Sequence, residues 1–230
     1  MFRYGQFCPI AKALEVLGER WTLLVARELL MGSTQFSQLQ RGLPKISPTT
    51  LSKRLAEMQD AGLVVRRRIP QQDGHEYRLT AAGRELQPLI GVMAEWGMRW
   101  ARAQMADDEL DVGALMADIE RRLVPEALPG GRTVLHFRFT DLDRFGAWWV
   151  RIDGGDVEVC LHDPGDDVDV YFTSTLRTLT EVWMGDVALS DARRSGALKV
   201  VGHDAWLRTL SAWFPLHVLA AHPRPGRGSS

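Results

Sequence analysis

The strongest constraint on the fold is a helix start near residue 48. Ser47 precedes Pro48, and serine is a preferred N-cap whereas proline suits the first helical turn. Leu51, Leu55 and Met58 follow at positions that lie on one side of a helix. The sequence therefore predicts a helix over residues 48–61 with one buried apolar face.

Helices precede this segment and a β-hairpin follows it. We expect helices at residues 9–17, from Trp21 to a break at Gly32, and at 36–40, the second with Leu24, Val25 and Leu29 on one face. Strands at 63–68, with Val65 inward, and 76–79 flank a predicted turn at 70–74. The order of helix, helix, short helix, capped helix and β-hairpin is typical of a winged helix-turn-helix.

The exposed face of the capped helix has the chemistry that contacts DNA. With Leu51, Leu55 and Met58 inward, hydroxyl and basic side chains lie on the opposite face, and the helix carries no acid before Glu57. Arginines on the hairpin would reach the DNA backbone or minor groove; the alternative is that they only protect a sheet edge. The predicted contacts are Ser47, Thr49, Thr50, Ser52, Lys53, Arg54, Arg66, Arg67, Arg68 and Arg78.

Charge is divided unevenly along the chain. Residues 1–105 hold 15 Lys and Arg against 9 Asp and Glu, and residues 106–230 hold 13 against 20. A basic half suits a polyanion such as double-stranded DNA, because neutralised phosphates release counterions. A chance partition of surface charge is the alternative. Opposite charge in the two halves favours two domains with different partners.

Several motifs in this half occur together in order. They are Cys8-Pro9-Ile10-Ala11, Gly18-Glu19-Arg20-Trp21-Thr22-Leu23-Leu24, Phe36-Ser37-Gln38-Leu39, Ile46 to Leu55, Ala61-Gly62-Leu63-Val64 and Glu76 to Gly83. Over residues 7–105 the chain resembles the HxlR family of bacterial transcriptional regulators. The resemblance implies a homodimer, held by the first and last helices of the domain, on a roughly palindromic operator. It also makes Cys8 a redox candidate, with a small buried side chain as the alternative.

A long helix is expected after a Thr80 cap. Its apolar stripe exceeds what one small domain needs to cover, which favours a dimer interface, although it could instead pack on the second domain of the same chain. The stripe consists of Leu86, Leu89, Ile90, Met93, Trp96, Gly97 and Trp100.

The second half changes from helices to strands. Strands are predicted at 133–139, 147–152, 157–161, 167–173 and 198–201, with a tight turn at residues 153–156. Helices are predicted at 110–123, 176–184, 189–195 and 205–219. The fold class is therefore α+β, with an N-terminal winged helix-turn-helix and a C-terminal mixed sheet covered by helices. The predicted parts are 1–106, a helix and linker at 107–131, an effector domain at 132–221, and a disordered tail at 222–230.

This second half resembles the sterol carrier protein type of lipid-binding domain. The resemblance rests on Gly154, on the strand from Val168 to Phe172, and on the segment from Gly196 to His203. It implies an apolar cavity for a small apolar ligand, whereas an ordinary aromatic core is the alternative. The candidate ligand-binding residues are Trp148, Phe172, Trp183, Trp206 and Trp213.

Catalytic patterns are missing from the sequence. His136, His162, His203, Ser190 and Asp163 are dispersed, and no nucleophile elbow, phosphate loop or two-His metal motif occurs. We therefore expect no enzyme, no cofactor and no metal. Two cysteines and no apolar run long enough to cross a bilayer favour the cytoplasm, with no membrane partner and no signal peptide.

Overall fold

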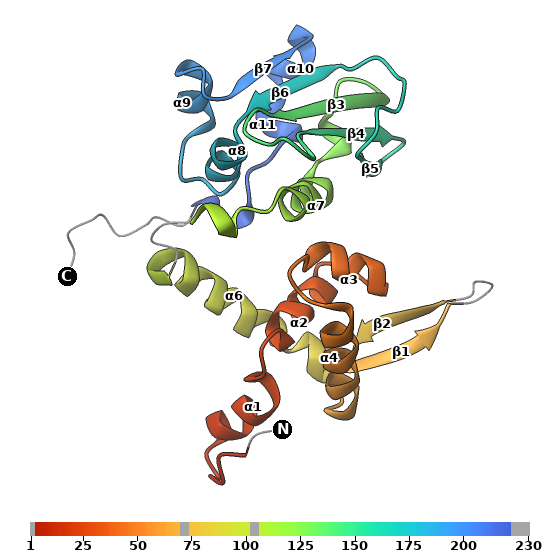
Figure 1. Ribbon diagram of the computed structural model, residues 1–230, viewed down its shortest axis with the longest axis vertical. Helices are drawn as coiled ribbons and strands as arrows, with labels where there is room; N and C mark the ends of the chain where they lie inside the picture. Colours follow the sequence, from red (N-terminus) through yellow and green to blue (C-terminus); the bar gives the residue numbers. More distant parts are fainter. Residues whose placement is uncertain (1–2, 70–73, 102–105, 222–230) are drawn as a thin grey trace. The chain divides into compact units, whose positions relative to one another are not determined.

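The computed structural model describes residues 3–69, 74–101 and 106–221. The chain forms two compact units, residues 1–94 and 95–230 (Figure 1). Most of the predicted turn at 70–74 and the predicted disordered tail at 222–230 lie outside the described residues.

The N-terminal unit has the predicted order of elements. They are α1 (Pro9–Leu17), α2 (Thr22–Leu30), α3 (Phe36–Gly42), α4 (Pro48–Asp60), β1 (Val64–Arg68), β2 (His75–Leu79), α5 (Ala81–Arg84) and α6 (Leu86–Trp96). The Ser47 hydroxyl accepts a hydrogen bond from the Thr50 backbone N–H at 3.1 Å, so the predicted cap of α4 is present.

Burial of one face of α4 organises this unit. Leu51, Leu55 and Met58 are almost fully buried in a cluster that includes Val25 and Leu39. The expectation for Leu24 was wrong, because its side chain is exposed. Val25 and Leu29, one helical turn apart, define the inner face of α2, and Leu24 lies about 100° away from Val25.

The two strands form the wing. They pair antiparallel from Val64 opposite Leu79 to Arg68 opposite His75. Val64 is buried and Val65 is only half-buried, so the predicted inward position was wrong by one residue. A shift of one residue exchanges the two faces of a strand.

The base of the wing is tied to the helix that follows it. The Thr80 hydroxyl donates to the Gly62 carbonyl at 2.7 Å and accepts from the Gly83 N–H at 3.1 Å. A Cβ at Gly83 would lie 2.2 Å from the carbonyl oxygen of Leu63. Only glycine lets α5 approach the start of β1 this closely.

The long helix expected after Thr80 is interrupted. The helix is interrupted by a turn at Glu85, whose backbone angles stay in the α region, resumes as α6, and continues as a π-helical turn at Gly97–Ala101. Pro88 explains the first break, because proline has no N–H to donate and its ring clashes with the carbonyl four residues earlier, at Arg84.

The C-terminal unit is built on a five-stranded sheet. Its strands are β3 (Arg132–Phe139), β4 (Ala147–Asp153), β5 (Asp156–Cys160), β6 (Val170–Ser174) and β7 (Lys199–Gly202), in the order β5-β4-β3-β6-β7. The β3–β6 pair is parallel and the other pairs are antiparallel. Gly154 and Gly155 both have positive φ, which fits the predicted tight turn between β4 and β5.

Helices supply the other half of this core. They are α7 (Val112–Arg122), α8 (Leu176–Trp183), α9 (Leu189–Arg194), α10 (Asp204–Arg208) and α11 (Leu210–Trp213), with 3₁₀ turns at Asp107–Glu109, Pro125–Ala127 and Val218–Ala221. The single helix expected at 205–219 was wrong. Pro215 lies two residues after the end of α11, and a proline there cannot donate the helical hydrogen bond to the Ser211 carbonyl.

We predict that Gly83→Ala lowers the free energy of unfolding by about 1–3 kcal/mol, because the new methyl group meets the Leu63 carbonyl. Gly91→Ala in α6 is the matched control. Nothing lies within 4 Å of its added Cβ, so it should stabilise the helix by about 0.5–1 kcal/mol. Thermal unfolding followed by circular dichroism measures both. Equal effects of the two substitutions would contradict the close approach at Gly83.

Candidate nucleic-acid interface

The exposed face of α4 begins at its capped end. Thr49, Ser52 and Lys53 are exposed, whereas the Ser47 hydroxyl is engaged with Thr50, whose own hydroxyl lies 2.7 Å away. The Lys53 ammonium lies 3.9 Å from the Glu57 carboxylate, and the lysine side chain is 72% exposed. The hydroxyls of Thr49 and Ser52 and the solvated ammonium of Lys53 are thus accessible to base edges and phosphates.

The structure corrects one member of the predicted set. Arg54 is 6% exposed, and its guanidinium pairs with Glu57 and, at 3.5 Å, with Glu19. Arg54 lies three residues after Leu51, on the inward side of α4. It supports the helix from within instead of facing DNA. The acidic partner Glu19, between α1 and α2, lies 35 residues away in the chain, so helical spacing alone could not reveal it.

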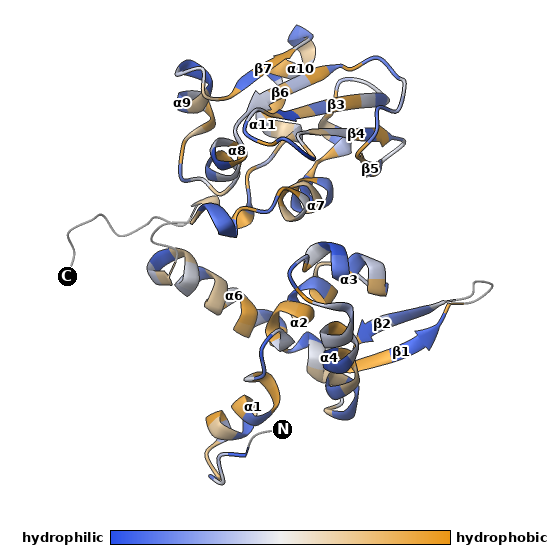
Figure 2. Cartoon of the chain, in the orientation of Figure 1, coloured by the Kyte–Doolittle hydropathy of each residue, from blue (hydrophilic) through white to orange (hydrophobic). Residues whose placement is uncertain are grey.

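The wing carries the remaining predicted cations. Arg66, Arg67 and Arg68 are exposed on β1, and Figure 2 shows hydrophilic residues along the outer part of both wing strands. Arg78 donates two hydrogen bonds to Glu76, at 2.8 and 2.9 Å. This pair holds the pKa of Glu76 below its usual value and raises the pKa of Arg78. Part of the wing's positive charge is therefore compensated, which the sequence analysis missed.

Two helices of the N-terminal unit expose apolar side chains. Ile10 and Leu14 on α1, and Val92 and Met93 on α6, are exposed. Leu86 and Ile90 instead pack against the domain core. The predicted stripe is thus split between an inner part that closes the unit and an outer part that is left open; the outer part continues to Trp96, which is 60% exposed.

Cys8 lies directly before α1 and is half-buried. It occupies the N-cap position of α1 without a side-chain capping hydrogen bond. Its proposed redox role stays a prediction, as does the alternative of a small packed side chain.

The aromatic residues proposed to line a ligand cavity are packed against one another. Phe172 stacks on Phe137 with ring centroids 4.5 Å apart and contacts Trp213 edge to face. The indole N–H of Trp183 donates to Asp118 at 2.7 Å, and that of Trp213 to the Trp206 carbonyl at 3.0 Å. These contacts match the alternative of an ordinary aromatic core.

The two other proposed cavity residues also have internal partners. The Trp148 indole donates to the Phe145 carbonyl at 2.7 Å, and the Trp206 indole lies 3.4 Å from the Thr133 hydroxyl. Both side chains are partly buried against the core. Ligand entry between these residues would require their packing to change.

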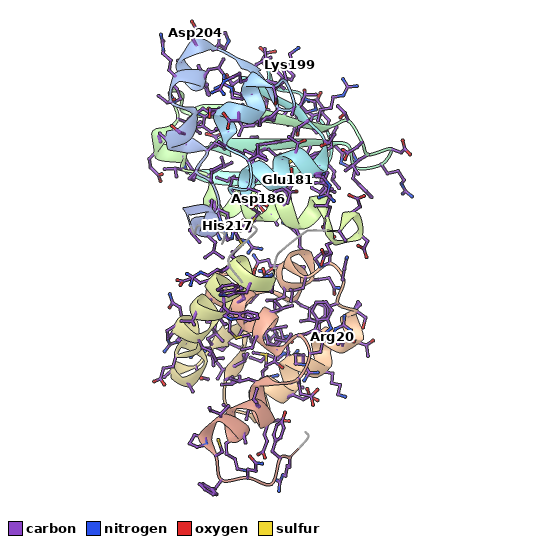
Figure 3. All side chains as sticks on the ribbon, turned by 90° about the vertical axis from the view of Figure 1, so that its left-hand side faces the viewer. Arg20, Glu181, Asp186, Lys199, Asp204 and His217 are labelled. Carbon is purple, nitrogen blue, oxygen red and sulfur yellow. The ribbon has the colours of Figure 1, made fainter. Side chains whose placement is uncertain are left out.

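A polar cluster that the sequence analysis missed involves His217. Its Nε2 lies 3.3 Å from an Arg122 nitrogen and 3.9 Å from an Asp118 oxygen, and its Nδ1 accepts from the Leu219 N–H. Figure 3 shows His217 near the end of the unit that carries Glu181 and Asp186, away from Lys199 and Asp204. The cluster joins the last 3₁₀ turn to α7.

The outer face of the sheet carries a row of side chains that crosses all five strands. In register, Cys160, Trp149, His136, Tyr171 and Val201 are neighbours from β5 to β7. His136 contacts both flanking aromatics, with centroids 4.8 Å from Trp149 and 5.6 Å from Tyr171. Burial lowers the pKa of His136 and raises that of the Cys160 thiol.

The histidines considered as catalytic candidates do not assemble into a site. His136 is enclosed by aromatic rings, and His203 contacts Trp206. Within residues 3–69, 74–101 and 106–221, no three His, Cys, Asp or Glu side chains are grouped so as to hold a metal ion. Among the same residues, no helix is both long and apolar enough to span a membrane.

The N-terminal region is similar to known regulators. The family described as HxlR-like helix-turn-helix matches residues 16–105. The HTH-type transcriptional regulator YvaP of Bacillus subtilis is 36% identical over 105 residues, which are 45% of this chain and 97% of that protein. The HTH-type transcriptional regulator Rv3095 of Mycobacterium tuberculosis is 46% identical over 91 residues, 38% of this chain and 56% of that protein.

Solved structures match over a similar share of the chain. The redox regulator HypR in its reduced form is 32% identical, covers 39% of this chain and 90% of its own, and has a TM-score of 0.37. The reduced form of the transcriptional regulator YodB from B. subtilis is 28% identical, covers 44% of this chain and 100% of its own, and has a TM-score of 0.38.

We predict that NMR titration places the pKa of His136 below its ordinary value of 6.5, chiefly because burial disfavours the imidazolium. Asp163→Asn should lower this pKa further, and Arg138→Gln should raise it, since these two charges act in opposite directions. Protonation then favours the unfolded chain, so the contribution of His136 becomes destabilising as the pH falls below about 6.5. Shifts of the same sign in both variants would contradict this arrangement.

Proposed function

This chain belongs to the HxlR-like helix-turn-helix family of transcriptional regulators, and we propose that it binds a palindromic DNA operator as a homodimer. The observation that carries the proposal is the exposed start of α4. Thr49, Ser52 and Lys53 are free on a helix whose opposite face is buried, and the first acid of α4 is Glu57. We infer that this end of α4 enters the major groove.

The wing supplies the second set of contacts in this proposal. Arg66, Arg67 and Arg68 are placed on exposed β1, beside α4 in the chain. Arginines in this position suit the phosphate backbone or the minor groove. They add affinity without base readout, whereas α4 supplies the sequence preference.

The homodimer is supported by the exposed apolar parts of α1 and α6. Side chains such as Ile10, Val92 and Met93 are costly to leave in water, and a second copy of the same surface would cover them. A two-fold dimer would place two α4 helices about 34 Å apart, one turn of DNA. Palindromic half-sites follow from that symmetry.

For the C-terminal unit we propose an effector role, with the sterol-carrier-like architecture as a hypothesis. The mixed five-stranded sheet supports it. Control by a small apolar ligand would require Phe172, Trp183 and Trp213 to separate from their present contacts. The alternative is a lipid-binding or protein-interaction module that uses the winged helix only to dimerise. The exposed hydroxyl and lysine side chains at the start of α4 favour the regulator.

Fluorescence anisotropy with DNA from upstream of the gene tests the proposal, with an unrelated duplex of equal length as control. We expect preferential binding to the upstream DNA. Equal binding to both duplexes that weakens strongly with salt would leave only electrostatic attraction. No binding to either would favour the interaction-module alternative.

Variants separate the two kinds of contact. Lys53→Ala should weaken operator binding, and Arg67→Ala should weaken binding to all duplexes and reduce the salt slope by about one. Lys199→Ala, an exposed lysine of the C-terminal unit, is the matched control and should leave the affinity unchanged. Unchanged affinity in both Lys53→Ala and Arg67→Ala would overturn the docking proposed for α4 and the wing.

The dimer has its own test. Met93→Glu should shift the protein toward monomer, because a carboxylate buried without a partner opposes association. Gln87→Glu adds the same charge at an exposed polar position of α6 and should leave the mass unchanged. Light scattering after size exclusion measures both. A Met93→Glu protein with the mass of the parent would argue against α6 as the interface.

A further inference from the structure

A pocket lies against the inward side of α4, away from the residues proposed to contact DNA. Its volume is about 240 Å³, and it is lined by the ends of α1 and α4 and the start of α2. A void needs only about 10–15 Å³ of such volume to hold one water molecule. The space therefore admits a small organic molecule, with Val16, Met58 and Leu63 as its apolar walls.

Two buried polar atoms at this pocket have no hydrogen-bond partner among the residues that the structure describes. They are the hydroxyl oxygen of Thr22 and the Nε of Arg54. Thr22 is 2% exposed and Arg54 is 6% exposed, so both side chains are shielded from bulk solvent. Buried donors are nearly always paired, and leaving one unpaired is costly. The terminal nitrogens of the same guanidinium are already engaged by Glu19 and Glu57, which leaves the Nε–H as its free donor.

The charge around the pocket limits what could fill it. Glu19, Glu57 and Asp60 line it together with the single cation Arg54. An anionic ligand would meet a surplus of carboxylates, whereas an ammonium group would be attracted to them. A carbonyl oxygen has two lone pairs and accepts from both an N–H and a hydroxyl.

We propose that this pocket is a binding site for a small, uncharged or cationic carbonyl compound, such as an amine-bearing carboxamide. Its carbonyl oxygen accepts from Arg54 Nε and pairs with the Thr22 hydroxyl. Its amine faces Glu57 and Asp60, and its short carbon chain lies against Val16 and Met58.

The site also has a route to DNA binding, a step that rests on the proposed function. Glu57 pairs with Arg54 inside the pocket and lies 3.9 Å from the Lys53 ammonium on the DNA-facing side. An amine that takes a share of Glu57 frees Lys53 from that carboxylate. Occupancy of the pocket therefore changes the charge that α4 presents to a phosphate.

Binding is tested first without DNA, on the full chain. The probe is 4-aminobutanamide, with butanamide and butanoate as matched neutral and anionic compounds. TROSY NMR follows the amides of residues 16–22 and 54–63 and the Nε–H signal of Arg54. We expect saturable shifts with the aminoamide, weaker ones with butanamide, and none with butanoate.

Thr22→Val keeps the shape of the side chain and removes the hydroxyl, so the fold is retained. It should weaken aminoamide binding about fivefold to tenfold, the value of one buried hydrogen bond. The ligand-free variant should melt at a higher temperature than the parent, since an unpaired buried hydroxyl is gone. Thr173→Val in the C-terminal unit is the matched control and should bind as the parent does.

Three results overturn the proposal: no shifts in the pocket with the aminoamide, equal binding of butanoate, or unchanged affinity in Thr22→Val. A final comparison of operator affinity with and without saturating aminoamide tests the link through Glu57. If the protein binds the aminoamide and no DNA, the site stands and the proposed function fails. If it binds DNA and no aminoamide, the site fails alone.

Discussion

Burial of the apolar face of α4 is the interaction on which the rest of the N-terminal unit depends. Each of Leu51, Leu55 and Met58 gains about 1.5–3 kcal/mol when its side chain leaves water. Together these gains fix the rotation of α4 about its axis. Once that rotation is fixed, the side chains of Thr49 and Lys53 must point outward into solvent. The surface that we propose to face DNA is thus a consequence of packing on the other side of the same helix.

The Ser47 cap and the Gly83 contact fix the two ends of this arrangement. The cap satisfies a backbone N–H in the first turn of α4 without a charged group, so the end that approaches DNA carries no carboxylate. At the other end, Thr80 bonds to the Gly62 carbonyl and Gly83 packs on Leu63, which holds the wing against the helix that follows. None of these contacts at the start of α4 and at the base of the wing involves the arginines that the wing carries.

Local sequence patterns predicted the helices and strands of both units, and the errors in those predictions have identifiable causes. The periodicity of apolar residues continues through Pro88 and Pro215, although neither residue can donate to a helical hydrogen bond. At both places the apolar periodicity predicted one continuous helix, whereas the structure has two or more helical segments. Val65 was placed inward because a strand of period two offers two equally patterned faces, and only the pairing of Val64 with Leu79 decides between them.

Other features depend on contacts that no local pattern contains. The aromatic residues of the C-terminal unit suit a cavity wall or a core equally well by composition, and no local pattern contains the indole hydrogen bonds to Asp118 and the Trp206 carbonyl. Arg54 has the spacing of a core position and the chemistry of a DNA contact. Sequence reasoning followed the chemistry, because one of the carboxylates that pair with the guanidinium, Glu19, comes from the distant connection between α1 and α2.

The inward turn of Arg54 has a consequence for the electrostatics of α4. A guanidinium that leaves water requires anionic partners, and here they are Glu19 and Glu57. The second of these carboxylates also lies 3.9 Å from the ammonium of the exposed Lys53. The same acid therefore balances a buried cation and a solvated one. Any group that enters the pocket and competes for Glu57 weakens its ion pairs with both Arg54 and Lys53. The packing on the buried side of α4 and the charge on its exposed side are therefore coupled.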